Sequence, residues 1–148
     1  MAQEIERKFL VRREKLPEHL PQGDELEQGY LSIDPTVRVR LVVRPDGTRH
    51  AALTVKGKGL LSRTEYEYPI PPADAESLLR LCTRSLRKVR RELGRFVLDH
   101  FKSRDLWLAE IELSSENETF ARPDWLGEEV TQDPGYTNAR LAEERRAQ

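Results

Sequence analysis

Charged side chains of like sign recur two residues apart along this chain. The pairs are Glu4 with Glu6, Arg38 with Arg40, Glu65 with Glu67, Lys88 with Arg90, and Glu110 with Glu112. Residues two apart in a strand point to the same face, so each pair predicts a strand with one charged face. On an exposed surface such pairs repel slightly. In a shared interior, acidic faces can hold divalent cations through hard oxygen ligands, and basic faces can hold phosphate oxygens.

Apolar residues alternate with these charges and predict the elements that position them. We expect strands at residues 4–11, 28–33, 37–44, 51–58, 63–70, 85–91, 96–101 and 106–114. Good helix formers predict a helix at 73–81. A terminal helix is expected to begin at Thr137 or Asn138, since both residue types cap helices well. Residues 14–20 are expected to form a connector, and residues 115–127 a loop.

Eight antiparallel strands with short turns predict a closed barrel, because closure removes the exposed edges of an open sheet. The charged faces could point outward, around an ordinary apolar interior, or inward. Like-signed pairing favours the inward arrangement, with the apolar faces outside and partly covered by helices near Leu78 and Leu141. At an effective dielectric near 20, unit charges ~4 Å apart interact by roughly 4 kcal/mol, against ~1 kcal/mol in bulk water. We therefore predict a mainly β (α+β) fold: a closed eight-stranded antiparallel β-barrel that forms a charged tunnel, with a few peripheral helices including a C-terminal one.

Composition narrows the classes of protein to which the chain can belong. Its 148 residues suit one domain, residues 1–148, and 25 basic against 26 acidic residues leave a charge of −1, which predicts no nucleic-acid partner. The single cysteine excludes an internal disulfide, and no apolar run approaches the ~20 residues of a membrane span. We expect a cytoplasmic protein without a membrane partner; whether it is a monomer or a homodimer stays open.

The first strand contains the sequence Glu4-Ile5-Glu6-Arg7-Lys8, an ExExK signature. Further motifs follow it in order along nearly the whole chain: Gln28-Gly29-Tyr30-Leu31, Arg38-Val39-Arg40, Thr54-Val55-Lys56-Gly57, Arg63-Thr64-Glu65-Tyr66-Glu67, Lys88-Val89-Arg90, Asp99, Glu110-Ile111-Glu112, Glu129-Val130-Thr131, and Tyr136-Thr137-Asn138 with Leu141 and Ala142. With this ordered series the chain resembles the CYTH superfamily, the triphosphate tunnel metalloenzymes, and within it the small bacterial branch.

The resemblance implies a tunnel that binds triphosphate compounds together with Mg2+ or Mn2+. The implied metal ligands are Glu4, Glu6, Glu110 and Glu112, and the implied phosphate-binding residues are Lys8, Arg38, Arg40, Lys56, Lys88 and Arg90. Glu65 or Glu67, together with Asp99, would orient basic residues or accept a proton from the attacking water. The implied catalytic set is therefore Glu4, Glu6, Lys8, Glu65, Glu67 and Asp99.

One departure from the family pattern lies near the C-terminus. Many relatives carry basic residues on both sides of the tyrosine there, where this chain has Gly135 and Thr137. Arg140, on the expected terminal helix, is the candidate substitute.

The leading functional hypothesis is hydrolysis of inorganic triphosphate to pyrophosphate and phosphate, because no segment is obviously built to recognise a base or a thiazolium ring. Three alternatives stay open: a thiamine triphosphatase or other organic triphosphatase, a class IV-type adenylyl cyclase, and a non-catalytic polyphosphate-binding module.

Overall fold

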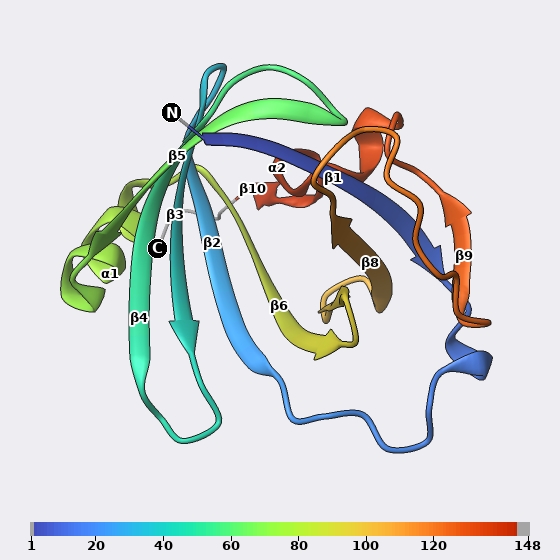
Figure 1. Ribbon diagram of the computed structural model, residues 1–148. Coiled ribbons are helices and arrows are strands. Elements are labelled where there is room, and N and C mark those ends of the chain that lie inside the picture. The colour runs from blue at the N-terminus through green and yellow to red at the C-terminus, as the bar shows by residue number, and fades with distance from the viewer. Residues whose placement is uncertain (1, 145–148) are drawn as a thin grey trace.

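Eight strands close into a ring in the computed structural model, which describes residues 2–144 (Figure 1). They are β1 (Ala2–Val11), β2 (Asp24–Ile33), β3 (Thr36–Val43), β4 (Arg49–Lys56), β5 (Ser62–Ile70), β6 (Arg84–Leu93), β7 (Phe96–Phe101) and β8 (Leu106–Glu112). Around the ring the order is β1, β5, β4, β3, β2, β6, β7, β8 and back to β1, and every pairing is antiparallel. The predicted closed eight-stranded barrel is confirmed.

The remaining elements are short. They are the helices α1 (Pro72–Leu81) and α2 (Asn138–Leu141), the 3-10 turns η1 (Arg13–Lys15) and η2 (Pro134–Tyr136), and the strands β9 (Leu126–Glu129) and β10 (Glu143–Glu144). Within residues 2–144, no helix has the length and apolar content needed to cross a membrane. Both α-helices were predicted, whereas β9 was expected to be loop up to Gly127. Strand β9 pairs with β1 over Phe9–Val11, beyond the stretch of β1 that pairs with β5. Its sequence lacks the alternation of apolar and polar residues that predicts a strand.

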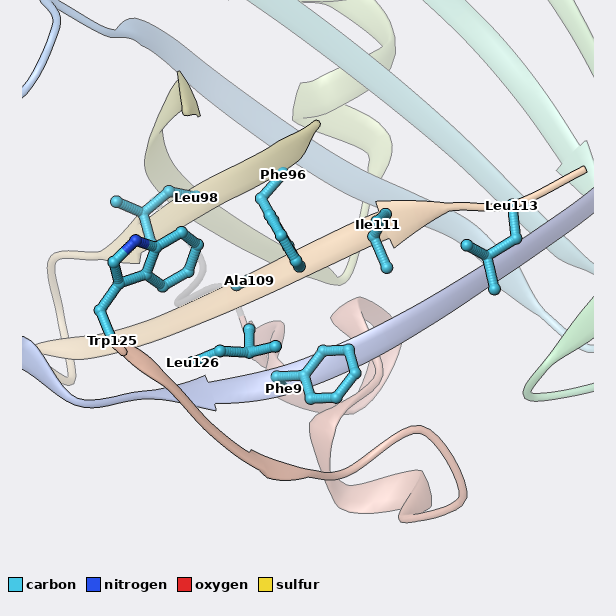
Figure 2. Packing of buried hydrophobic residues seen from close by; sticks show 8 residues of the cluster. All are labelled: Phe9, Phe96, Leu98, Ala109, Ile111, Leu113, Trp125 and Leu126. Carbon is cyan, nitrogen blue, oxygen red and sulfur yellow. The ribbon is translucent and has the colours of Figure 1, made fainter. Parts of the chain in front are cut away.

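Apolar side chains on one face of β1, β7 and β8 form a layer on the outside of the ring. Phe9, Leu98 and Ile111 are buried on this outer surface beneath Trp125 and Leu126 (Figure 2). The rings of Phe96 and Trp125 meet edge to face, 5.2 Å apart. A hydrophobic layer outside the barrel therefore stabilises this half of the fold.

Helix α1 covers the other apolar face, as predicted for the segment near Leu78. Its buried residues Ala75 and Leu79 pack on Val39, Leu41 and Ala51 of β3 and β4. A proline at the first helical position suits the start of α1, where its missing N–H has no intrahelical partner.

Helix α2 does not cover an outer face, so the prediction for Leu141 is wrong. Leu141 packs among Leu86, Phe101 and Leu108, which share strand faces with the inward charges of β6, β7 and β8. The interior is thus apolar where it meets α2, and a helix of four residues fills it. Burial of this inner apolar surface places α2 against the inside of the barrel.

Gly29 allows α1 to approach β2 closely. A Cβ atom at this position would lie 2.7 Å from Sγ of Cys82 and 2.9 Å from Cδ2 of Leu79. We therefore expect Gly29→Ala to lower the free energy of unfolding by about 1–3 kcal/mol through overpacking, measured by urea denaturation. The control is Gly57→Ala, whose Cβ would lie 3.6 Å from its nearest neighbour; equal losses in both variants would contradict this account.

Candidate functional site

Strand β1 carries charged residues into the ring between two neighbouring strands. Its residues Ala2–Ile5 pair with β5, and residues Glu6–Leu10 pair with β8. Glu4, Glu6 and Lys8 alternate with the outward Phe9 and so face the interior. This strand therefore places its acids beside charged groups from both neighbours.

Strand register sets opposite charges side by side on the inner face. The directly opposed pairs are Glu4 with Arg63, Lys56 with Glu65, Lys8 with Glu110, and Arg90 with Asp99. Cross-strand neighbours of opposite charge attract, and a charge that leaves water requires such a partner. The register thus supplies counter-charges for most of the interior.

Glu4 and Glu65 share one lysine. Nζ of Lys56 lies 3.0 Å from Oε1 of Glu4 and 3.3 Å from Oε2 of Glu65. Burial alone would raise the pKa of Glu4, but its hydrogen bond with Glu65 and the charges of Lys56 and Arg63 outweigh burial and lower it to about 2. The pKa of Glu65 is raised, first by the same hydrogen bond and then by burial. The pKa of Glu65 therefore lies above that of Glu4, and of the two carboxylates Glu65 is the stronger base.

Glu6 and Glu110 form the acidic centre of the site. The charge of Glu110, then burial and the charge of Glu4, raise the pKa of Glu6 to about 7. Burial opposes ionisation of Glu110 as well, but Lys8, Arg90 and Lys88 hold its pKa well below the usual range. Nζ of Lys8 lies 3.5 Å from Oε1 of Glu110. The cations near Glu6 therefore compensate only part of the negative charge that surrounds its carboxylate.

Asp99 is buried and holds two cations. Its carboxylate accepts hydrogen bonds of 2.8 Å from Nζ of Lys88 and from both Nε and Nη2 of Arg90. Burial raises the pKa of Asp99, but the charges of Lys88 and Arg90 lower it further than burial raises it. Burial in turn lowers the pKa of Lys88 to about 7 in spite of Asp99. Asp99 therefore fixes the positions of both basic side chains.

The two arginines of β3 have no acid directly opposite. Arg38 faces Tyr30 and Thr54, and Arg40 stands between Gln28 and Ala52. Nη2 of Arg38 lies 3.3 Å from Oγ1 of Thr54 and 3.9 Å from Oε1 of the exposed Glu67. Burial, with the charges of Arg38 and Arg90, lowers the pKa of Arg40 to about 9. These two cations can accept an anionic ligand without first losing a directly opposed carboxylate.

The C-terminal segment also reaches the basic residues. The carbonyl oxygen of Tyr136 accepts a hydrogen bond of 2.7 Å from Nζ of Lys8, and Oδ1 of Asn138 accepts one of 3.3 Å from Nζ of Lys88. Thr137 caps α2 by accepting from the backbone N–H of Arg140. Arg140 itself is exposed, so it does not bring a charge into the interior.

The family profile described as "CYTH domain" matches residues 2–144. The chain belongs to the CYTH family. The match spans all eight strands of the ring and the segment that carries α2, so the interior described above lies within the family's domain.

Named relatives of this CYTH chain are similar over nearly their full length. An inorganic triphosphatase of Acetivibrio thermocellus is 39% identical over 150 residues, which cover 95% of this chain and 94% of the relative. An inorganic triphosphatase of Nitrosomonas europaea is 38% identical over 149 residues, which cover 94% of this chain and 96% of the relative. A solved structure described as the inorganic triphosphatase NE1496 matches with a TM-score of 0.60 and 32% identity and covers 99% of both chains.

The CYTH ring brings most of the predicted site residues together. The residues on its inner face are Glu4, Glu6, Lys8, Arg38, Arg40, Lys56, Glu65, Glu67, Lys88, Arg90, Asp99 and Glu110. Glu112 shares a face with Glu110 and is opposite Glu6, but its side chain is exposed at the end of β8. Its part in metal binding stays a prediction.

Two inward residues received no role from the sequence. Arg63 lies 3.5 Å from Glu4 and 3.8 Å from Glu6, and Gln28 accepts a hydrogen bond from Arg40. Arg63 is two residues before Glu65, so strand alternation already placed it on the acidic face. Gln28 has no charge, and its motif gave no sign that it meets Arg40.

The donor set fits a divalent cation, although the carboxylates are held by bases in this arrangement. Within residues 2–144, no group of three or more acidic, histidine or cysteine side chains is arranged to hold a metal. Carboxylate oxygens are nevertheless the ligands that Mg2+ and Mn2+ prefer. The raised pKa of Glu6 beside Glu110 marks a place that is short of positive charge. A bound cation would supply that charge.

Removal of the Asp99 charge should leave Lys88 and Arg90 buried without a counter-charge. We expect Asp99→Asn to lower the free energy of unfolding by about 3–5 kcal/mol near pH 7, measured by urea denaturation. The carboxylate has a lowered pKa in the folded state, so its contribution is present above its unfolded pKa and lost in acid. The gap between variant and parent should therefore narrow below about pH 4.

Asp105→Asn is the matched control. Asp105 is exposed and pairs with Arg13 and His100 on the surface, so its loss should cost about 1 kcal/mol or less. Similar destabilisation by the two substitutions would contradict a special role for the buried Asp99.

Proposed function

We propose that this protein hydrolyses inorganic triphosphate to pyrophosphate and phosphate in the presence of Mg2+ or Mn2+. The observation that carries the proposal is the meeting, in one interior, of unopposed arginines on β3 with the acidic pair Glu6 and Glu110. Cations bind the phosphate oxygens, and carboxylates hold the metal that accompanies a triphosphate. The names of the two relatives at 39% and 38% identity support the same substrate.

The metal would be held by Glu4, Glu6, Glu110 and Glu112. When bound, it neutralises charge on the phosphoryl oxygens and makes the phosphorus a better electrophile. The phosphate chain would be bound by Lys8, Arg38, Arg40, Lys56, Lys88 and Arg90. Because phosphoryl transfer depends mainly on positioning and on charge stabilisation, these side chains would provide much of the catalysis.

The acids that remain have different environments and suit different roles. Asp99, held by Lys88 and Arg90, would orient those two cations. Glu65 has a raised pKa and would accept a proton from the attacking water more readily than Asp99, whose pKa is lowered. Glu67, which is exposed and lies beside Arg38, is the other candidate base. Water would attack the terminal phosphorus, and the P–O bond to the pyrophosphate leaving group would break.

The test is parallel incubation with inorganic triphosphate, thiamine triphosphate and ATP, each with Mg2+, with Mn2+ and with chelator. Orthophosphate, pyrophosphate and cyclic AMP are followed. We expect orthophosphate release that is fastest from inorganic triphosphate and is abolished by the chelator. Glu6→Gln should lower kcat/KM by about 10²- to 10³-fold, because a charged group at the reacting centre is lost.

Glu27→Gln is the control, since Glu27 lies on the opposite face of β2 from the inward Gln28 and pairs with the exposed Arg87. It should retain the parent's activity. Cyclic AMP from ATP would move the protein to the cyclase branch, and faster cleavage of thiamine triphosphate to the organic triphosphatases. Metal-linked binding without any product would make it a binding module. The cytoplasmic location stays a prediction.

A further inference from the structure

Gln28 is a fully buried amide among the arginines of the interior. It lies on the inner face of β2, opposite Arg40 of β3. Its Oε1 accepts a hydrogen bond of 2.8 Å from Nε of Arg40. A guanidinium only donates, so the end of the amide that meets Arg40 must be the oxygen. The amide nitrogen, Nε2, is therefore at the other end.

Two hydrogen-bond donors in this region lack acceptors. Among residues 2–144, neither Nε2 of Gln28 nor Nε of the neighbouring Arg38 has a hydrogen-bond partner, although both atoms are buried. Burial raises the pKa of the nearby Tyr30 hydroxyl, an effect that the Gln28 side chain opposes, so Tyr30 is a neighbour of the amide but not a hydrogen-bond partner of Nε2. Buried donors without acceptors are uncommon and costly. Two of them on adjacent strands indicate that an acceptor completes the site.

The charges around Gln28 define that acceptor as an anion. Burial, and then repulsion by the charges of Arg38 and Arg90, lowers the pKa of Arg40. Another cation at position 28 would add to this repulsion. A neutral amide can donate to an anionic oxygen without that penalty, and it still offers Arg40 an acceptor.

We propose that Gln28 contacts the substrate, with Nε2 donating a hydrogen bond to a non-bridging oxygen of the triphosphate while Oε1 holds Arg40. The inference rests on the proposed function, since inorganic triphosphate is the anion concerned. The competing account is that Gln28 only positions Arg40 and touches no ligand.

A double-mutant cycle separates the two accounts. The variants are Gln28→Met, Arg40→Met and the double variant, and the probe is inorganic triphosphate. Its Kd is measured by calorimetry in metal-free buffer, and KM and kcat are measured with Mg2+. Thermal melts confirm folding, and Arg40→Lys replaces Arg40→Met if the latter does not fold. Gln132→Met, at an exposed position, is the control.

We expect Gln28→Met to weaken triphosphate binding by about tenfold or more, as for a hydrogen bond to a charged acceptor. Adding Gln28→Met to the Arg40 variant should weaken binding by the same factor. The effect should be a higher Kd and KM, with little change in kcat. If Gln28→Met costs nothing once Arg40 is changed, or leaves the parent's affinity unaltered, the proposal is overturned.

Binding and phosphate release by the unsubstituted protein distinguish failure of this inference from failure of the proposed function. If it binds triphosphate but releases no phosphate, the hydrolase proposal fails, and the cycle still tests Gln28 through Kd. If it does not bind triphosphate at all, both proposals fail.

Discussion

The constraint on which this structure depends is that charges inside a closed ring of strands need counter-charges at short range. Register provides them at four places, where an acid and a base are direct cross-strand neighbours. Asp99 extends this arrangement by holding Lys88 and Arg90 together. Strand β3 is the exception, because Arg38 and Arg40 have polar or small residues on both sides. Arg38 still pairs with the exposed Glu67 at 3.9 Å, and the proposed substrate would neutralise the remaining charge of this strand.

A charged interior obliges the fold to bury its apolar surface elsewhere. Phe9, Leu98 and Ile111 are buried outside the ring beneath Trp125, and α1 covers Val39 and Leu41 on the other side. Hydrophobic burial outside the barrel is therefore what offsets the desolvation of the charges within it. The apolar group around Leu141 fills part of the interior, and the segment before it meets Lys8 and Lys88. The same C-terminal segment thus fills part of the barrel interior and contacts the site.

Much of this arrangement could be predicted because strand alternation is a local property. Because they are two residues apart, Glu4 and Glu6 share one face of their strand, and so do Arg38 and Arg40. In the closed ring these faces point inward. The same rule places Arg63 on the acidic face of β5, although Arg63 and Glu65 carry opposite charges and so do not form a like-signed pair. It does not cover Glu112, which has the right parity but lies at the exposed end of β8. The alternation of residues along a strand tells which face a side chain is on. How deeply that side chain lies in the barrel depends on its distance from the end of the strand.

The sequence by itself determined the strands, their charged faces, the two helices and the family resemblance, since each rests on the order of neighbouring residues. Tertiary structure alone decided which charges meet. The raised pKa of Glu6 depends on Glu110 from another strand, and the bond from Arg40 to Gln28 depends on the register of β2 with β3. It also decided that Leu141 packs inside the barrel. Pair energies fall steeply with distance and with exposure to water, and only the folded chain defines those two quantities.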